Sequence, residues 1–199
     1  MMKVRDSGMP EEESWSTFFR PVEVLGVFGL DRGVETLVDF GCGYGTFTLA
    51  AAKLVSGTVH ALDIEPEMIE TVRAKCRQEG LANVRTEVRD FVSSGSGLME
   101  SSVDAALLFN ILHHEDPVGL MVEAWRILRP GGRLAVIHWN FDPDTPRGPS
   151  LEIRPSPEQC IEWGRRAGFA FNEEDRFDLR PHHYGLLFRK PAQNRADHE

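Results

Sequence analysis

Cysteine is scarce in this chain, and the three residues present, Cys42, Cys76 and Cys160, are far apart in the sequence. None of them stands in a C-x-x-C spacing, so the sequence offers neither a disulfide framework nor a cysteine cluster for a metal. Isolated thiols of this kind are typical of a reduced compartment. We therefore expect a cytoplasmic protein.

Long apolar runs are also absent. No segment approaches the roughly 18 residues that a membrane-spanning helix needs. Residues 1–10 contain no apolar stretch of the kind found in a secretion signal. The sequence therefore predicts a soluble, unprocessed protein with no membrane partner.

Positive charge is in deficit, since 22 Lys and Arg face 31 Asp and Glu and the formal net charge is -9. Binding to a nucleic-acid backbone needs clustered Lys and Arg, so no nucleic-acid partner is expected. A small or neutral substrate is easier to accommodate. The length of 199 residues and the hydrophobic share of 41% fit one domain with a proper core. The chain could be a monomer or a homodimer.

The most informative segment that is present is residues 36–46, TLVDFGCGYGT. An apolar, strand-like run contains Asp39 near its end and leads into a turn with Gly41, Gly43 and Gly45. Glycines at alternate positions permit positive φ angles and remove side chains, so we expect peptide N–H groups of the turn to contact a nucleotide-like ligand. The run 46–54 predicts a helix whose N-terminus faces the same place.

A second acidic residue, Asp63, closes the strand-like run 58–62 about twenty residues further on, where a carboxylate can accept hydrogen bonds from both ribose hydroxyls. The third glycine, Gly45, comes one residue earlier than in the G-x-G-x-x-G fingerprint of dinucleotide sites. The spacing therefore favours an adenosine-type ligand without a diphosphate.

These features resemble motif I and the acidic strand end of the class I S-adenosylmethionine-dependent methyltransferases. The likeness continues, in the family's order, through residues 88–91 (VRDF), 103–114 (VDAALLFNILHH) and 128–134 (LRPGGRL). Such a resemblance implies an α/β fold, Rossmann-like and doubly wound, with a mostly parallel seven-stranded sheet and a C-terminal antiparallel hairpin. It also implies S-adenosylmethionine as cofactor and methyl transfer to a small-molecule acceptor by in-line displacement.

The resemblance also assigns contacts to the cofactor. The glycine turn would surround the methionine moiety, with Asp39 near its amino group. Asp63 would hold the ribose, Ile64 would lie against the adenine, and Asn110 would sit near the sulfonium. Asp90 would reach the adenine edge, although an Asp in a loop can instead cap the next segment. The full set of predicted cofactor-binding residues is Asp39, Gly41, Cys42, Gly43, Tyr44, Asp63, Ile64, Asp90, Phe91 and Asn110.

Candidate catalytic residues follow the fourth and fifth strands. In the family, the segment after strand four lies between cofactor and acceptor, which makes His113 or His114 a candidate base near neutral pH. A packing histidine is the alternative. His138, at the end of strand five, is the third candidate. We expect no metal at residues 113–116 (HHED), because adjacent ligands on one short segment rarely converge on a single ion.

Acceptor contacts are expected from the N-terminal aromatics, the end of strand five, the long loop after it and the last strand. The candidates are Trp15, Phe19, Trp139, Arg154 and His183. The aromatics could instead pack at the sheet edge, and charges in a loop are often simply solvated. We expect one methyltransferase domain over residues 1–190, with a helical cover at 1–30, a long loop at 140–156 and a polar tail at 191–199.

Three local predictions can be compared with the structure. Residues 93–97 (SSGSG) indicate a flexible break, and strand five is expected over residues 133–139. The helix after Asp116 is expected to bury the stripe Val118, Met121, Val122, Trp125 and Leu128.

Two other functions stay open on the sequence. One is an NAD(P)-dependent Rossmann oxidoreductase, which would use Asp63 but leaves the early Gly45 without an account. The other is a module that binds S-adenosylmethionine without catalysis, because function resides in the site and not in the fold.

Overall fold

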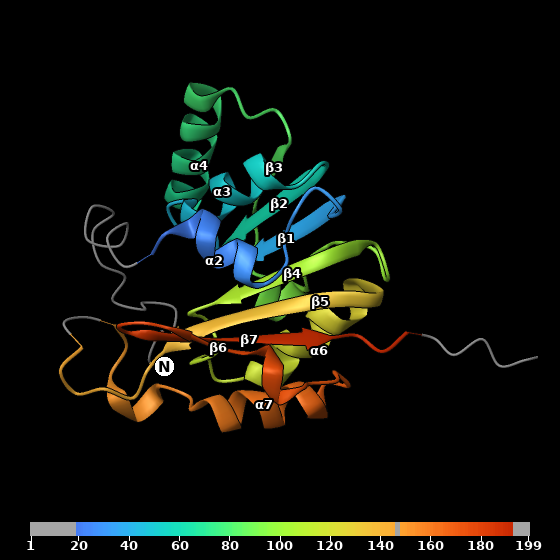
Figure 1. The fold of residues 1–199 in the computed structure, drawn as a ribbon. Coiled ribbons are helices and arrows are strands. Elements are labelled where there is room, and N and C mark those ends of the chain that lie inside the picture. The colour runs from blue at the N-terminus through green and yellow to red at the C-terminus, as the bar shows by residue number, and fades with distance from the viewer. Residues whose placement is uncertain (1–18, 146–147, 193–199) are drawn as a thin grey trace, which may run out of the picture.

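The structure is a computed structural model that describes residues 19–145 and 148–192. Trp15, with the rest of residues 1–18 of the expected helical cover, and residues 193–199 of the expected polar tail lie outside the described residues. The described chain forms a seven-stranded sheet in the order β3-β2-β1-β4-β5-β7-β6 (Figure 1). The strands are β1 (Thr36–Phe40), β2 (Thr58–Asp63), β3 (Val84–Val88), β4 (Val103–Phe109), β5 (Leu128–Trp139), β6 (Arg176–Leu179) and β7 (His183–Arg189).

The sheet has the predicted topology. Strands β1 to β5 pair in parallel, whereas β7 is antiparallel to both β5 and β6. The direction of the strand order reverses between β1 and β4, as in a doubly wound sheet. The predicted fold class is therefore confirmed.

Most of the helices begin where a proline or a cap favours it. Proline occupies the first turn of α2, α4, α6 and α7, where its fixed φ suits a helix and no N–H is needed. Asp116 accepts a hydrogen bond from the N–H of Gly119 at 2.8 Å, and Ser156 forms a capping box with Gln159. The helices are α2 (Pro21–Val27), α3 (Thr46–Leu54), α4 (Pro66–Glu79), α5 (Phe91–Ser94), α6 (Pro117–Ile127) and α7 (Pro157–Arg166). None of those in the described ranges has both the length and the apolar character needed to cross a membrane.

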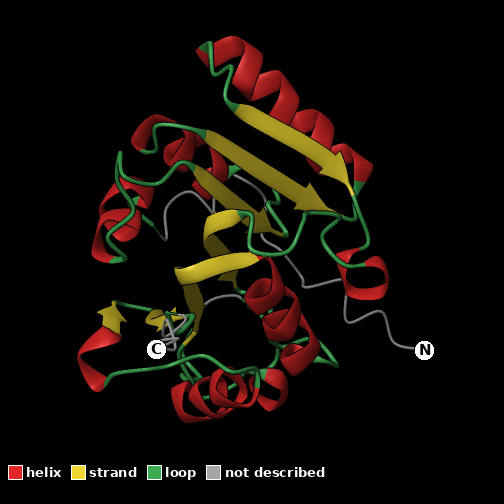
Figure 2. Cartoon of the chain, turned by 90° about the vertical axis from the view of Figure 1, so that its right-hand side faces the viewer, coloured by secondary structure: helices red, strands yellow, loops and turns green. Residues whose placement is uncertain are grey.

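Alternation along the central strands builds a core on each face of the sheet. In β4, Ala106 and Leu108 belong to the cluster that α6 and α7 cover, whereas Ala105 and Leu107 belong to the cluster under α2 and α3. Figure 2 shows helices against both faces of the sheet. Both faces of β4 are thus removed from water, which explains its continuous apolar sequence.

Strand β5 is longer than predicted. It begins at Leu128, which pairs with Val103, and after an irregularity Arg133 pairs with Ala105. The intervening Pro-Gly-Gly segment bulges out, and the N–H of Gly131 donates to the carbonyl of Lys190 at 2.9 Å. The Pro-Gly-Gly segment is therefore a bulge inside the strand, and the residue that follows β7 holds it in place.

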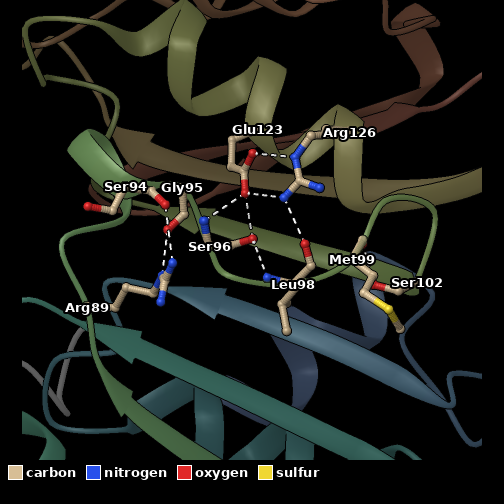
Figure 3. A network of polar contacts seen from close by, with 9 residues as sticks. All are labelled: Arg89, Ser94, Gly95, Ser96, Leu98, Met99, Ser102, Glu123 and Arg126. Atoms are coloured by element: carbon tan, nitrogen blue, oxygen red, sulfur yellow. Dashed lines mark hydrogen bonds and ion pairs between the residues drawn. The ribbon is translucent and has the colours of Figure 1, made fainter.

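The prediction of a flexible break at residues 93–97 is wrong. Ser93 and Ser94 belong to α5, and the next residues are tied to α6 (Figure 3). The carboxylate of Glu123 accepts hydrogen bonds from the N–H of Ser96 at 2.7 Å and from its hydroxyl at 2.6 Å. Arg126 donates to the carbonyl of Leu98 at 2.8 Å. Side chains distant in sequence hold this turn, so its local composition gave no sign of them.

Helix α6 also buries a different face from the expected one. Val122, which the stripe places in the core, is exposed, and Leu128 is buried as the first residue of β5. Of the expected stripe, only Met121 belongs to the buried residues of the helix. Those residues are Leu120, Met121, Ala124 and Ile127.

Candidate active site

The candidate site lies where β1 and β4 run side by side and the strand order reverses. Ligands of open α/β sheets bind at this point, beyond the carboxyl ends of the strands. The glycine turn follows β1 and Asn110 follows β4, whereas Asp63 is the last residue of β2 and His138 the last but one of β5. Sheet pairing thus collects most of the predicted site residues at one edge.

The glycine turn has the expected backbone but uses its N–H groups differently. Gly41, Gly43 and Gly45 have φ angles of 73°, 51° and 83°. The N–H groups of Gly41 and Cys42 donate to the carbonyl of Leu62 at 2.8 and 3.0 Å, and that of Gly43 donates to Asp63 at 2.9 Å. These three groups already have partners within the chain. The turn therefore presents to a ligand a surface with few side chains. Cofactor contact by residues 41–44 stays a prediction.

Asp63 braces the turn from the end of β2. Its Oδ2 accepts from Gly43, and its Oδ1 accepts from the N–H of Glu65 at 3.0 Å. The side chain is buried, yet each carboxylate oxygen can accept more than one hydrogen bond. Asp63 can therefore hold the turn and a pair of hydroxyl groups together. Ile64 follows it and is half-buried.

Asp39 is buried next to a second negative charge. The hydroxyl of Thr48 donates to its Oδ2 at 2.6 Å. Burial raises the pKa of Asp39 to about 6, the Thr48 hydrogen bond opposes this shift, and the charge of Asp63 adds to it. Two buried carboxylates near each other attract a positively charged ligand.

Asn110 is the residue that most clearly indicates a ligand. It follows β4 with a φ of 55°, which is uncommon for a residue with a side chain. Its Oδ1 and Nδ2 are buried and have no hydrogen-bond partner among the described residues. Buried amides are almost always satisfied, so this one fits a bound polar group. The unpaired amide and the two buried carboxylates together suit a cationic nucleoside such as S-adenosylmethionine.

The residues assigned to the adenine have structural roles as well. Asp90 caps α5, since its Oδ1 accepts from the N–H of Ser93 at 3.2 Å. Phe91 is buried and packs edge-on against Phe40, with ring centroids 5.3 Å apart. The alternative of a capping Asp is thus observed, and the adenine contacts of both residues stay predictions.

The structure brings two of the three candidate catalytic histidines together. Nδ1 of His113 lies 3.3 Å from Nε2 of His138, whereas Nδ1 of His114 accepts from the N–H of Asp116 at 3.1 Å. Burial is the main cause that lowers the pKa of His113, to about 4, and the pKa of His138 lies well below its usual value for the same reason. Both imidazoles are therefore neutral near pH 7.

Four of the five predicted acceptor contacts form one buried group, and Trp15 lies outside the described residues. The ring centroid of His183 lies 4.1 Å from that of Trp139 and 4.4 Å from that of Phe19. The guanidinium of Arg154 lies 5.7 Å from the Trp139 ring centroid.

Arg154 organises the long loop after β5. Its guanidinium donates to the carbonyls of Pro149 at 2.8 Å and Asn140 at 3.0 Å. A short 3₁₀ helix, η1 (Leu151–Ile153), adds further order to the loop. Whether the acceptor reaches the group of Phe19, Trp139, Arg154 and His183 stays a prediction.

Sequence reasoning missed two side chains that support the site. Thr48 binds Asp39, and Lys75 of α4 donates to the carbonyl of Tyr44 at 2.8 Å. A Thr in the first turn of a helix and a partly exposed Lys on an amphipathic helix carry no distinctive pattern. Cys42 is buried, and burial and the charges of Asp39 and Asp63 raise the pKa of its thiol, so it is no nucleophile. Across residues 19–145 and 148–192, no group of three His, Cys, Asp or Glu is arranged to hold a metal.

Comparisons with known proteins show which family the chain is similar to. A family model described as a methyltransferase domain matches residues 38–136. The chain is 35% identical over 161 residues to an uncharacterized 37.1 kDa protein in transposon TN4556 of Streptomyces fradiae, covering 76% of this chain and 46% of that protein. It is 35% identical over 104 residues to the aklanonic acid methyltransferase DauC of Streptomyces sp. strain C5, covering 51% and 46%.

The chain thus spans about half the length of these curated relatives. Among solved structures, a SAM-dependent methyltransferase from Aquifex aeolicus superposes with a TM-score of 0.80 at 25% identity, covering 90% of this chain and 94% of that one. Because sequence and fold agree, the chain belongs to the class I S-adenosylmethionine-dependent methyltransferases, and its cofactor is S-adenosylmethionine.

Proposed function

We propose that this chain transfers the methyl group of S-adenosylmethionine to a small-molecule acceptor. The observation that carries the proposal is the buried amide of Asn110, which has no partner among the described residues and follows β4 beside the switch point of the sheet. Asp39 and Asp63, at or next to the ends of β1 and β2, are buried as well. An acidic chain with a net charge of -9 suits a small acceptor better than a nucleic acid. The name of DauC, a methyltransferase of aklanonic acid, supports the same class.

The bound cofactor supplies a methyl group on a positively charged sulfur. Asp39 and Asp63 provide the negative potential that attracts such a cation, and Asp63 keeps the glycine turn in place through Gly43. Asn110 offers an amide donor and acceptor that are already desolvated. The chain's main contribution to the rate is then to hold the acceptor in line with the methyl group, which can be worth about 7–11 kcal/mol.

The test has two parts. Calorimetric titration with S-adenosylhomocysteine and with NADH is expected to give saturable binding of the first compound only. The oxidoreductase reading has no support in the relatives and the solved structure reported above, and NADH binding would revive it. Incubation with S-adenosylmethionine and a metabolite extract, followed by detection of S-adenosylhomocysteine, separates an enzyme from a binding module. Binding without turnover on any extract would contradict methyl transfer.

The predicted contact of Asn110 near the sulfonium has its own test. Asn110→Ala is expected to weaken S-adenosylmethionine binding about tenfold, the scale of one or two lost hydrogen bonds. Asn172→Ala, which changes an amide in the C-terminal part of the chain, serves as the control and is expected to bind normally. Equal affinities of the two variants would remove Asn110 from the site.

A further inference from the structure

The tautomer of His138 is fixed by the main chain. Its Nδ1 lies 2.9 Å from the backbone nitrogen of Trp139, and a peptide N–H can only donate. Nδ1 must therefore be the unprotonated, accepting nitrogen of the ring. Since burial keeps the ring neutral, its single proton is on Nε2.

The tautomer of His113 follows from that of His138. Nε2–H of His138 points to Nδ1 of His113 at 3.3 Å, so this Nδ1 accepts and carries no proton. The proton of a neutral His113 is then on Nε2. Nε2 makes no hydrogen bond to any residue in the described ranges, and it is the one ring nitrogen of the pair left for a ligand.

A protonated His113 would conflict with this arrangement. Two N–H groups, Nδ1–H of His113 and Nε2–H of His138, would then face each other. Rotating the His138 ring by 180° would not relieve the conflict, because Nδ1 would then lose the hydrogen bond from the N–H of Trp139. The neighbouring groups add to the conflict, since His114 disfavours a positive charge on His113, and His183 and Arg154 disfavour one on His138.

We propose that His113 is a hydrogen-bond donor to an anionic oxygen of the methyl acceptor, through Nε2–H, and that His138 is the positioning residue that fixes this tautomer. This inference rests on the proposed function and names the class of acceptor. The lone pair that a general base needs is occupied by the bond from His138. The same holds for His114, because its Nδ1 accepts a hydrogen bond from the N–H of Asp116.

The chemistry balances without a base if the acceptor oxygen is already ionised. A lone pair of the oxygen forms the new O–C bond while the C–S bond breaks, and the electron pair of that bond stays on sulfur. No proton has to be removed. Carboxylic acids and acidic phenols meet this condition near pH 7, and a neutral N–H donor can bind their oxygen without taking it out of reaction by protonation.

The tautomers can be measured on the ligand-free protein. Long-range ¹H–¹⁵N spectra of the full chain at pH 7 are expected to show His113 and His138 as neutral rings protonated at Nε2. His138→Leu removes the donor and should let His113 exchange between tautomers, whereas His138→Gln keeps an N–H donor and should preserve Nε2–H. If His138→Leu does not fold, the wild-type and His138→Gln spectra decide. An imidazolium or an Nδ1–H ring at His113, or a tautomer unchanged in folded His138→Leu, would overturn the inference.

The role toward the acceptor is tested with a probe panel of aromatic carboxylic acids and phenols and S-adenosylmethionine. At least one probe is expected to be methylated on oxygen. His113→Gln, which keeps a donor, should turn that probe over at least about ten times faster than His113→Leu, the scale of a hydrogen bond to a charged group. An equal loss of turnover in His113→Gln and His113→Leu would indicate that His113 acts as a general base instead. If the whole panel fails while S-adenosylhomocysteine still binds, the anionic acceptor is wrong and the proposed function stands.

Discussion

Asp39 is a carboxylate whose ionisation the fold opposes. The ligand-free protein holds its proton below about pH 6, because burial raises its pKa to about 6. A cationic cofactor favours the ionised form, so binding below this pH must release a proton. We expect the affinity for S-adenosylmethionine to fall by up to about tenfold per pH unit below pH 6. Calorimetry in buffers of different ionisation heat measures the proton directly.

Asp39→Asn provides the control for this linkage. Asn can still accept the hydrogen bond from Thr48 and cannot titrate, so its weaker binding should be flat between pH 5 and pH 7. A wild-type affinity that is the same at both pH values would remove Asp39 from the neighbourhood of the cofactor's charge.

Asp63 is expected to contribute to both binding and local order. Asp63→Ala removes the predicted ribose contact and the bond to Gly43, and should weaken S-adenosylhomocysteine binding by about 1.5–3 kcal/mol. Asp178→Ala, at an exposed ion pair of β6, is the matched control. Unchanged calorimetric affinity in a folded Asp63→Ala protein would show that the carboxylate does not touch the ligand.

At the scale of elements, Gly45 determines how closely α3 approaches α4. A Cβ added there would lie 2.6 Å from Cδ1 of Leu49 and 3.0 Å from Cγ2 of Val72, at a φ of +83°. Gly45→Ala should therefore lower the free energy of unfolding by about 2–4 kcal/mol, from overpacking plus backbone strain. Gly80→Ala has a similar φ of +68° with nothing within 4 Å, and isolates the backbone effect at about 1 kcal/mol. Urea unfolding in which Gly45→Ala loses no more than Gly80→Ala would rule out the packing effect.

Glu123 fastens the turn after α5 to α6. Its carboxylate holds both the N–H and the hydroxyl of Ser96 and also pairs with Arg126. Glu123→Ala should cost about 1–3 kcal/mol of stability and speed amide hydrogen exchange at Ser96. Glu162→Ala, at an exposed position of α7, should leave that amide protected. Equal protection of the Ser96 amide from exchange in the two variants would mean that Glu123 does not stabilise the turn.

Over the whole molecule, buried neutral histidines should make stability depend on pH. The folded-state pKa values of His113 and His183 are lowered to about 4 and about 3, and that of His138 is lowered as well, chiefly by burial. The unfolded chain takes up protons first, so this stability is present above pH 6.5 and is lost as pH falls toward 4. Asp39 has the opposite effect on stability between pH 6 and pH 3.8, the usual pKa of an Asp, because the folded state takes up its proton first.

We expect the free energy of unfolding to fall as the pH is lowered, because the histidines outnumber Asp39. Each histidine contributes up to about 1.4 kcal/mol per pH unit. Urea midpoints at pH 7.5, 6 and 5 measure it, with the slope m checked for constancy. His113→Gln should flatten the profile, since one titrating ring is removed. A midpoint that does not change between pH 7.5 and pH 5 would mean that these rings are not neutral in the folded state.

The sequence by itself determined the fold class and the family. Its alternating runs, the glycine turn and the order of motifs from residue 36 to residue 137 depend on local patterns, because strand and helix periods are written along the chain. The prolines in the first turns of α4, α6 and α7 are local signals of the same kind. Asp39 and Asp63 drew attention because they lie at or next to the end of a recognisable strand, and Asn110 because its segment resembles the family's fourth strand. Their contacts with the cofactor stay predictions.

The tertiary structure alone decided which groups face one another. The pairing of β4 with β5 sets His113 against His138, and no spacing between positions 25 residues apart encodes that contact. Burial then determined charge states, as at Asp39, and backbone geometry determined that the turn's N–H groups point inward. These properties depend on distances and desolvation between segments remote in sequence. Local patterns carry no information about them.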